Sequence, residues 1–79
     1  MLPTKAFVLI ETAVGKTRDV AGSLESLGAM DSVDVVTGPY DIIAVVSASD
    51  LSSVGDSVAT NVHSIEGVVR TVTCLSVEV

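Results

Sequence analysis

Residues 36–46 read VTGPYDIIAVV, and this stretch decides the fold. The pair Gly38-Pro39 is typical of a turn, because glycine accepts backbone angles that other residues avoid and proline fixes its own φ angle. The five residues 42–46 are all apolar, which is typical of a buried strand. Residues 31–37, before the turn, place valine and aspartate on opposite faces of another strand. Together these features predict a β-hairpin.

The chain before the hairpin predicts one strand and one helix. Residues 5–12 (KAFVLIET) are apolar at nearly every position, which favours a strand that is buried on both faces. Residues 16–27 predict an amphipathic helix, with Gly28 placed to end it. The apolar residues of this helix are spaced four and three apart: Val20, Leu24 and Leu27.

The chain after the hairpin predicts a second helix and a last strand. Asp50 stands where a helix N-cap is expected, and Gly67 is placed to close the helix. The apolar residues between them have helical spacing: Leu51, Val54, Val58, Val62 and Ile65. The rest of the chain alternates in polarity and predicts a strand on which Val69, Thr71 and Thr73 point the same way.

The order of elements predicts an α+β fold of the ferredoxin-like βαββαβ type. This sandwich has a four-stranded antiparallel sheet with two helices on one face. No linker divides the 79 residues, so we expect residues 1–79 to form a single domain. Two helices cover only one face, yet residues 6–10 and 42–46 are apolar on both. Because exposed apolar patches mark interfaces, we expect dimers that form through the other face.

The composition of the chain limits its expected cellular location and its expected binding partners. Ten acidic against four basic residues give a formal charge of −6 and a pI near 4.2. This charge repels a phosphate backbone, so we expect no direct binding of nucleic acid. No apolar run approaches the ~20 residues that span a bilayer, so we expect a soluble protein with no membrane partner. Cys74 is the only cysteine, which excludes an intrachain disulfide and fits the reducing cytoplasm.

Residue spacing gives no support for a catalytic, metal or cofactor site. Gly15-Lys16-Thr17 resembles the end of a phosphate-binding loop, but Ile10 stands where that motif needs glycine. His63 and Cys74 are each alone in type and have no partner at ligand spacing. We expect His63 to be a partly exposed residue at a helix end and Cys74 to be a small buried thiol. We therefore expect neither an enzyme nor a metal or cofactor protein.

Two groups of residues are candidates for binding a small molecule. Asp41 stands between the turn that ends in Tyr40 and an apolar strand, where amides are exposed and a carboxylate can receive an ammonium group. An ordinary turn aspartate is the alternative interpretation. Thr71 and Thr73 offer two hydroxyls on one face of a strand, although β propensity alone also accounts for them.

Taken together, these motifs resemble the C-terminal ligand-binding domain of Lrp/AsnC transcription regulators, the domain for regulation of amino-acid metabolism. The residues that carry the resemblance are Ala6-Phe7-Val8-Leu9-Ile10, Gly15-Lys16, the run 36–46 and the tail 65–73 (IEGVVRTVT). The resemblance covers essentially the whole chain. Full-length members also carry an N-terminal helix-turn-helix domain, so the chain resembles the stand-alone form, and DNA recognition is not carried over.

The resemblance implies an α-amino-acid effector, held between dimers that form through their sheets and often assemble into octameric rings. The site residues that it implies are Gly38, Tyr40, Asp41, Thr71 and Thr73. It further implies indirect modulation of transcription, with full-length regulators as partners. Pro39 occupies a position that varies in the family, and it removes an amide donor from the turn.

Three functions remain open on the sequence alone. The first is an amino-acid-binding module, with the ligand's ammonium near Asp41 and its carboxylate on turn amides or threonine hydroxyls. The second is a purely structural partner that co-assembles with full-length relatives and binds no ligand. The third is an enzyme on the dimeric α+β barrel plan, for which His63 and Tyr40 are the available acid or base groups. Fold alone cannot separate these functions.

Overall fold

The computed structural model describes residues 3–77. The elements, in chain order, are β1 (Thr4–Thr12), α1 (Thr17–Leu27), β2 (Ser32–Val35), β3 (Ile42–Ala48), α2 (Leu51–Ser57), the π-helix η1 (Val58–Val62) and β4 (Val68–Leu75). Because η1 directly continues α2, the predicted βαββαβ order and α+β class are confirmed. Within the described residues, no helix has the length and apolar character needed to cross a bilayer.

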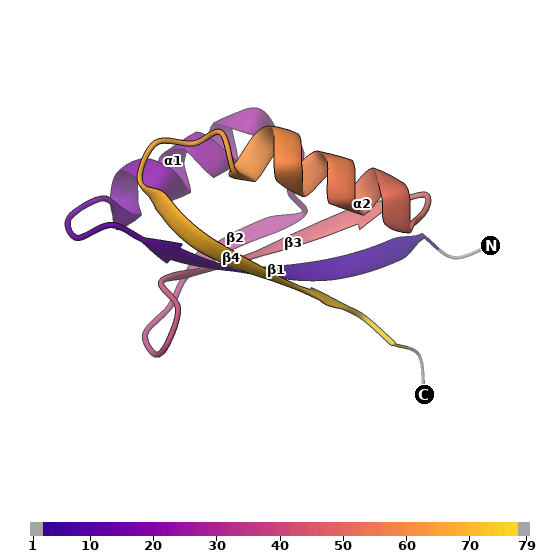
Figure 1. The fold of residues 1–79 in the computed structure, drawn as a ribbon, viewed down its shortest axis with the longest axis horizontal. Coiled ribbons are helices and arrows are strands. Elements are labelled where there is room, and N and C mark those ends of the chain that lie inside the picture. Colours follow the sequence, from indigo (N-terminus) through magenta and orange to yellow (C-terminus); the bar gives the residue numbers. More distant parts are fainter. Residues whose placement is uncertain (1–2, 78–79) are drawn as a thin grey trace.

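The four strands form one antiparallel sheet in the order β2-β3-β1-β4. The central strands are β1 and β3, and Phe7 on β1 lies opposite both Val45 on β3 and Cys74 on β4. The edges of the sheet are β2 and β4. Figure 1 shows the helices together on one face of the sheet, as predicted.

The helices cover what we call the inner face of the sheet, and the core lies there. Alternate residues of the two central strands point into it with exposures of 1% or less: Ala6, Val8, Ile10, Ile42, Ala44 and Val46. The helices contribute Val20, Ala21, Leu24, Val54, Val58 and Val62. The core is therefore built almost entirely from small and branched aliphatic side chains.

The opposite face of the sheet, which we call the outer face, is also apolar. Its apolar residues are Phe7, Leu9, Ile43, Val45, Val72 and Cys74. The four on β1 and β3 are half-buried, and Val72 is 36% exposed. The expectation of a buried thiol is wrong, because Cys74 lies opposite Phe7 on this face and is exposed. No helix among residues 3–77 covers the outer face.

The predicted helix ends at Gly28 and Asp50 are confirmed, but the prediction that Gly67 closes the second helix is wrong, because that helix ends at Val62. Gly28 has a φ of 67° and ends α1, and the Asp50 carboxylate accepts a hydrogen bond from the Ser53 amide at 2.8 Å. Two leucines with the predicted helical spacing are exposed, Leu27 by 46% and Leu51 by 60%. Each stands in a terminal turn, where neighbours three and four residues away are missing on one side.

The second helix widens at its end instead of continuing as an α-helix to Ile65. In η1 the His63 amide donates to the Val58 carbonyl at 3.1 Å, the five-residue spacing of a π turn. Val54, Val58 and Val62 are all buried. Residues four apart drift around a regular α-helix, and a wider turn brings them back toward one line. The wider turn is thus compatible with burial of all three valines on one side of the helix.

A β-bulge interrupts β4 and changes the faces of its first residues. Arg70 pairs with Glu11, but Val68 pairs with Thr12, so Val69 is an extra residue on β4. Val68 packs against the core, whereas Val69 is 61% exposed. Val69 has no partner on β1, so the strict alternation predicted for this strand is interrupted there. The strand ends at Leu75, and the last two residues of the predicted strand, 78–79, lie outside the described residues.

Candidate ligand site

The turn between β2 and β3 is fixed at its base by backbone hydrogen bonds. The Val36 amide donates to the Asp41 carbonyl at 2.9 Å, and the Asp41 amide donates to the Ile10 carbonyl at 2.9 Å. Gly38 has a φ of 133°, a left-handed conformation that favours glycine over other residues. The turn is therefore held against β1 at a defined position, and it presents Tyr40 and Asp41 there.

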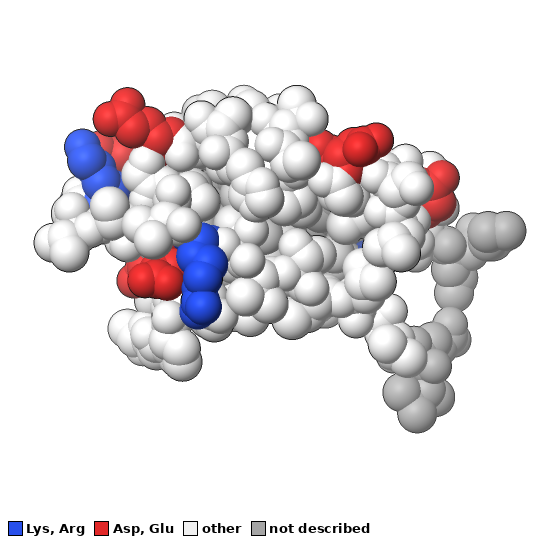
Figure 2. All heavy atoms as spheres, in the orientation of Figure 1, with Lys and Arg blue, Asp and Glu red and all other residues white. Residues whose placement is uncertain are grey.

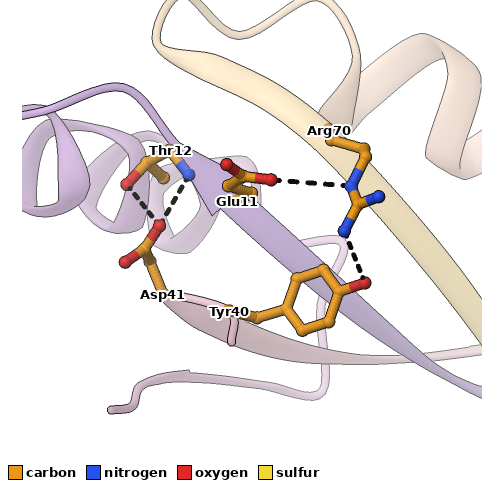
Figure 3. Close-up of polar contacts among 5 residues, drawn as sticks. All are labelled: Glu11, Thr12, Tyr40, Asp41 and Arg70. Carbon is orange, nitrogen blue, oxygen red and sulfur yellow. Dashed lines mark hydrogen bonds and ion pairs between the residues drawn. The ribbon is translucent and has the colours of Figure 1, made fainter. Parts of the chain in front are cut away.

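The Asp41 carboxylate joins β3 to the end of β1. Its Oδ2 atom accepts hydrogen bonds from the Thr12 amide at 2.8 Å and from the Thr12 hydroxyl at 3.2 Å (Figure 3). The Thr12 hydroxyl lies 2.8 Å from the hydroxyl of Thr17, the first residue of α1. Oδ1 accepts no hydrogen bond from the described part of the chain. Asp41 thus has one structural oxygen and one oxygen that remains available.

Tyr40 belongs to a second polar group on the outer-face side. Its hydroxyl accepts a hydrogen bond from the Arg70 guanidinium at 3.0 Å, and that guanidinium lies 5.5 Å from the centre of the Tyr40 ring. Arg70 also lies 3.5 Å from a Glu11 carboxylate oxygen (Figure 3). The side chains of Arg70 and Glu11 are 61% and 42% exposed. Such an exposed ion pair contributes little to stability, so the group orients Tyr40 more than it holds the fold.

A mostly apolar hollow of about 500 Å³ lies beside the turn. Its lining residues are Leu9, Val36, Thr37, Pro39, Tyr40 and Ile43. Leu9 and Ile43 belong to the outer face, so the hollow continues that apolar surface up to the turn. It is large enough for an aliphatic side chain.

Thr71 and Thr73 point the same way, as predicted, toward the inner-face side of β4. They lie opposite Ile10 and Val8, two residues of the core. The Thr71 hydroxyl is 2.7 Å from Nε2 of His63. Thr73 is exposed and Thr71 is half-buried. Because β4 is an edge strand, both hydroxyls stand at the rim of the molecule.

The five predicted site residues therefore form two groups within one protomer. Gly38, Tyr40 and Asp41 lie at the turn, whereas Thr71 and Thr73 lie beyond β1 and on the inner-face side. Two strand spacings, about 10 Å, separate the ends of β3 and β4. The ammonium and carboxylate of an α-amino acid are bonded to the same carbon and cannot reach both groups.

Sequence reasoning missed the residues that contact the predicted ones. Thr12 and Arg70 are 29 and 30 residues away from their partners, Asp41 and Tyr40. His63 has no second metal ligand near it in sequence, and nothing in its neighbourhood along the chain indicates its contact with Thr71. Contacts between strands depend on register and on the bulge in β4, neither of which can be read from one sequence.

A second hollow, of about 300 Å³, lies between α1 and the turn before β4. Its lining residues are Lys16, Asp19, Ser23, Ile65 and Glu66. Lys16 is exposed there. No group of three or more metal-ligating side chains occurs within residues 3–77.

Comparison with known proteins gives one family. The family model described as Lrp/AsnC ligand binding domain matches residues 5–79. The crystal structure of TTHA0845 from Thermus thermophilus is similar, with 34% sequence identity and a TM-score of 0.88. That match covers 96% of this chain and 95% of the other. No curated protein matches the sequence significantly.

Two longer proteins share the fold at lower identity. Escherichia coli AsnC has a TM-score of 0.88 at 18% identity, over 95% of this chain and 51% of that one. The feast or famine regulatory protein of Mycobacterium tuberculosis, complexed with L-methionine, has a TM-score of 0.81 at 19% identity, over 96% of this chain and 51% of the other. The chain thus corresponds to about half of each of these proteins.

Proposed function

Because the chain belongs to the Lrp/AsnC ligand-binding domain family, we propose that it binds an α-amino acid at an interface between protomers. The observation that carries the proposal is the Asp41 carboxylate. Its Oδ2 is held by Thr12, while Oδ1 accepts no hydrogen bond from the described residues. A fixed carboxylate with one available oxygen suits an ammonium group, because charge-assisted hydrogen bonds are the strong ones.

The separation of the two residue groups supports a site shared between protomers. One protomer offers Gly38, Tyr40 and Asp41, and another offers Thr71 and Thr73. The ammonium then lies at the turn of the first protomer and the carboxylate at the β4 rim of the second. Neither protomer binds both ends of the ligand, so ligand binding favours the assembled state over the free protomer.

The hollow beside Tyr40 supports an apolar ligand side chain. Its lining is mostly apolar, and one of its lining residues, Tyr40, directly precedes Asp41 in the turn. An aliphatic or thioether side chain gains free energy by leaving water, whereas a charged one loses hydration there. The complex of the Mycobacterium tuberculosis relative with L-methionine agrees in ligand class.

The assembly that we propose begins with a dimer through the outer face, and the dimers associate further, up to an octamer. Covering Phe7, Leu9, Ile43 and Val45 removes apolar surface that the chain itself leaves half-buried. We place the protein in the cytoplasm, with no enzymatic activity. Its effect on transcription is indirect, through mixed assembly with full-length regulators, because a formal charge of −6 opposes binding to DNA.

A thermal-shift screen of the twenty standard L-amino acids tests the proposal. A ligand at a hundred times its Kd stabilises the native state by about 2.7 kcal/mol, which raises the melting temperature. At least one apolar amino acid is expected to do so. A panel in which no amino acid shifts the melting temperature contradicts the proposed function.

Asp41→Asn tests the assigned ammonium site. Asparagine keeps an oxygen for Thr12 but removes the charge, so affinity for the best amino acid of the screen is expected to fall roughly ten- to a hundredfold. Asp56→Asn, an exposed aspartate on α2, is the matched control and should bind as wild type does. Equal affinities of wild type and Asp41→Asn would assign Asp41 to the turn alone.

A ligand-free structural partner is the second candidate function. It is favoured by the hydrogen bonds from Thr12 to Asp41, since these give Asp41 a role that needs no ligand. In that case, mixing the chain with a full-length relative changes the relative's oligomer distribution equally with and without amino acids. Light scattering of the mixture separates the two functions.

A further inference from the structure

His63 stands at the end of η1 and reaches across to β4. Its ring nitrogen Nε2 lies 2.7 Å from the Thr71 hydroxyl. The backbone amide of His63 closes the π turn on Val58 at 3.1 Å. A π turn changes the direction in which the following side chain leaves the helix, compared with a regular α turn. The widened end of the helix therefore aims His63 at Thr71.

The backbone of β4 beside Thr71 is also open to a ligand. The Ser76 amide donates to the Lys5 carbonyl at 2.8 Å, so Ser76 and every second residue before it direct their backbone groups toward β1. The backbone groups of Thr71 and Thr73 consequently point away from β1. Since β4 is an edge of the described sheet, these amides have no strand partner there.

Negative charge is scarce around this part of β4. Residues 68–77 (VVRTVTCLSV) contain no acidic side chain, although the whole chain carries a formal charge of −6. With β4 toward the viewer, Figure 2 shows charged groups on the left side and at the upper right, with uncharged residues between them. Hydroxyl and amide donors are thus gathered where repulsion of an anion is weakest.

We propose that His63 is a positioning residue for the α-carboxylate of the ligand, acting through the Thr71 hydroxyl at the rim of β4. This inference rests on the proposed function and adds a residue to that site. When Nε2–H donates to Thr71 Oγ1, the hydroxyl hydrogen of Thr71 is free to donate to the carboxylate. When Nε2 carries no hydrogen, Thr71 donates to His63 instead, and the carboxylate loses a donor.

Four variants test the inference by isothermal titration. They are His63→Leu, Thr71→Val, the double variant and His63→Gln. The probes are those of the twenty L-amino acids that stabilise wild type, together with their methyl esters. His63→Leu and Thr71→Val should each weaken binding of the amino acid about tenfold. The double variant should bind no more weakly than either single variant, because the two residues act as one unit.

The methyl esters and the glutamine variant show whether His63 positions Thr71 for the carboxylate or has a merely structural role. Esters keep a carbonyl acceptor but lack the charge of the carboxylate, so their affinity should differ between wild type, His63→Leu and Thr71→Val by much less than tenfold. His63→Gln supplies an amide donor and should recover most of the affinity. Ser64→Ala is the matched control and should bind as wild type does, because the Ser64 hydroxyl donates to the Thr60 carbonyl and not to β4.

The outcomes distinguish this inference from the proposed function. If wild type binds an amino acid and His63→Leu binds it equally well, the role of His63 is wrong and the proposed function stands. Additive losses in the double variant also overturn the inference, since they show that His63 does not act through Thr71. If wild type binds none of the twenty amino acids, both are wrong.

Discussion

The two faces of β1 and β3 have similar side chains but different surroundings. On the inner face, residues such as Val8 and Ala44 are completely buried under the helices. On the outer face, their neighbours Leu9 and Val45 are only half-buried, although they are equally apolar. Full burial of one such side chain is worth about 1.5–3 kcal/mol. The same two strands therefore carry one apolar face that the chain buries completely and one that it leaves half-buried.

Charges around the outer face suit a second copy of the same surface. Lys5 lies over the Phe7 ring, 5.3 Å from its centre, and the pair of Arg70 and Glu11 stands at the other end of β1. Asp34 faces the same side from β2, opposite Ile43. A two-fold contact places each patch against its own copy, so a rim that contains both signs can form complementary pairs.

Ala44→Lys is expected to have the largest effect, because it breaks the inner face. Ala44 is 0% exposed and belongs to the core residues of β3 that the helices cover. An ammonium group buried there without a partner costs several kcal/mol, which is comparable with the ~5–15 kcal/mol that stabilises a small domain. The variant should show no cooperative thermal unfolding by circular dichroism. A melting temperature near that of wild type would contradict the assignment of the inner face.

Val45→Lys, one residue further along, should break association and leave the protomer folded. Val45 points to the outer face, where a lysine stays in water in the free protomer but meets the partner in a dimer. Sedimentation should show a dimer or larger species for wild type and an 8.1 kDa monomer for the variant. Ala59→Lys, on the exposed side of η1, is the control and should sediment as wild type does.

Most of the fold follows from the sequence because its signals are local. The apolar run 42–46, the capping Asp50 and the turn glycines each fix a boundary within a few residues of themselves. The bulge at Val69 and the π turn of η1 were not predicted. Both depend on how a whole element packs against the rest of the sheet, so they have no local signal.

Only part of the candidate site follows from the sequence. The turn could be located, and so could the shared direction of Thr71 and Thr73, because both depend on spacing along the chain. The hydrogen bond from Thr12 to Asp41 and the contact of His63 with Thr71 could not. Those contacts join residues on different elements and require the register of the sheet.

Gly67→Ala should destabilise the packing of α1 against the rest of the fold. The expected effect is smaller than that of Ala44→Lys and larger than that of changing the Asp50 cap. Gly67 has a φ of 102°, and an added Cβ would lie 3.0 Å from Lys16 Cβ and 3.0 Å from Val20 Cγ2 on α1. Strain and overpacking together should lower the free energy of unfolding by roughly 1–3 kcal/mol in urea titrations. Gly22→Ala, in α1 with nothing within 4 Å, is the control and should raise it by roughly 0.5–1 kcal/mol.

The smallest effect on stability is expected for changes at Asp50, the residue that caps the start of α2. Hydrogen bonding from Ser53, chiefly from its backbone amide at 2.8 Å, holds the pKa of the Asp50 carboxyl below its ordinary value. A carboxyl with a lowered pKa in the folded state stabilises the protein above its unfolded pKa of about 3.9. That contribution is lost as the pH falls through the folded pKa.

Asp50→Asn and Asp50→Ala separate the charge of this cap from its hydrogen bond. Asparagine is an equally good N-cap, so Asp50→Asn should melt close to wild type at neutral pH, whereas Asp50→Ala should melt at a lower temperature. Because asparagine does not titrate, the stability of wild type relative to Asp50→Asn should decrease as the pH falls from about 7 to about 2. Thermal unfolding of the three proteins across this range measures the difference.

A difference between wild type and Asp50→Asn that stays constant with pH would show that the Asp50 charge does not act on α2. The cap would then work through hydrogen-bond geometry alone, and the helix layer would owe its stability to the packing of Val54, Val58 and Val62 on the inner face.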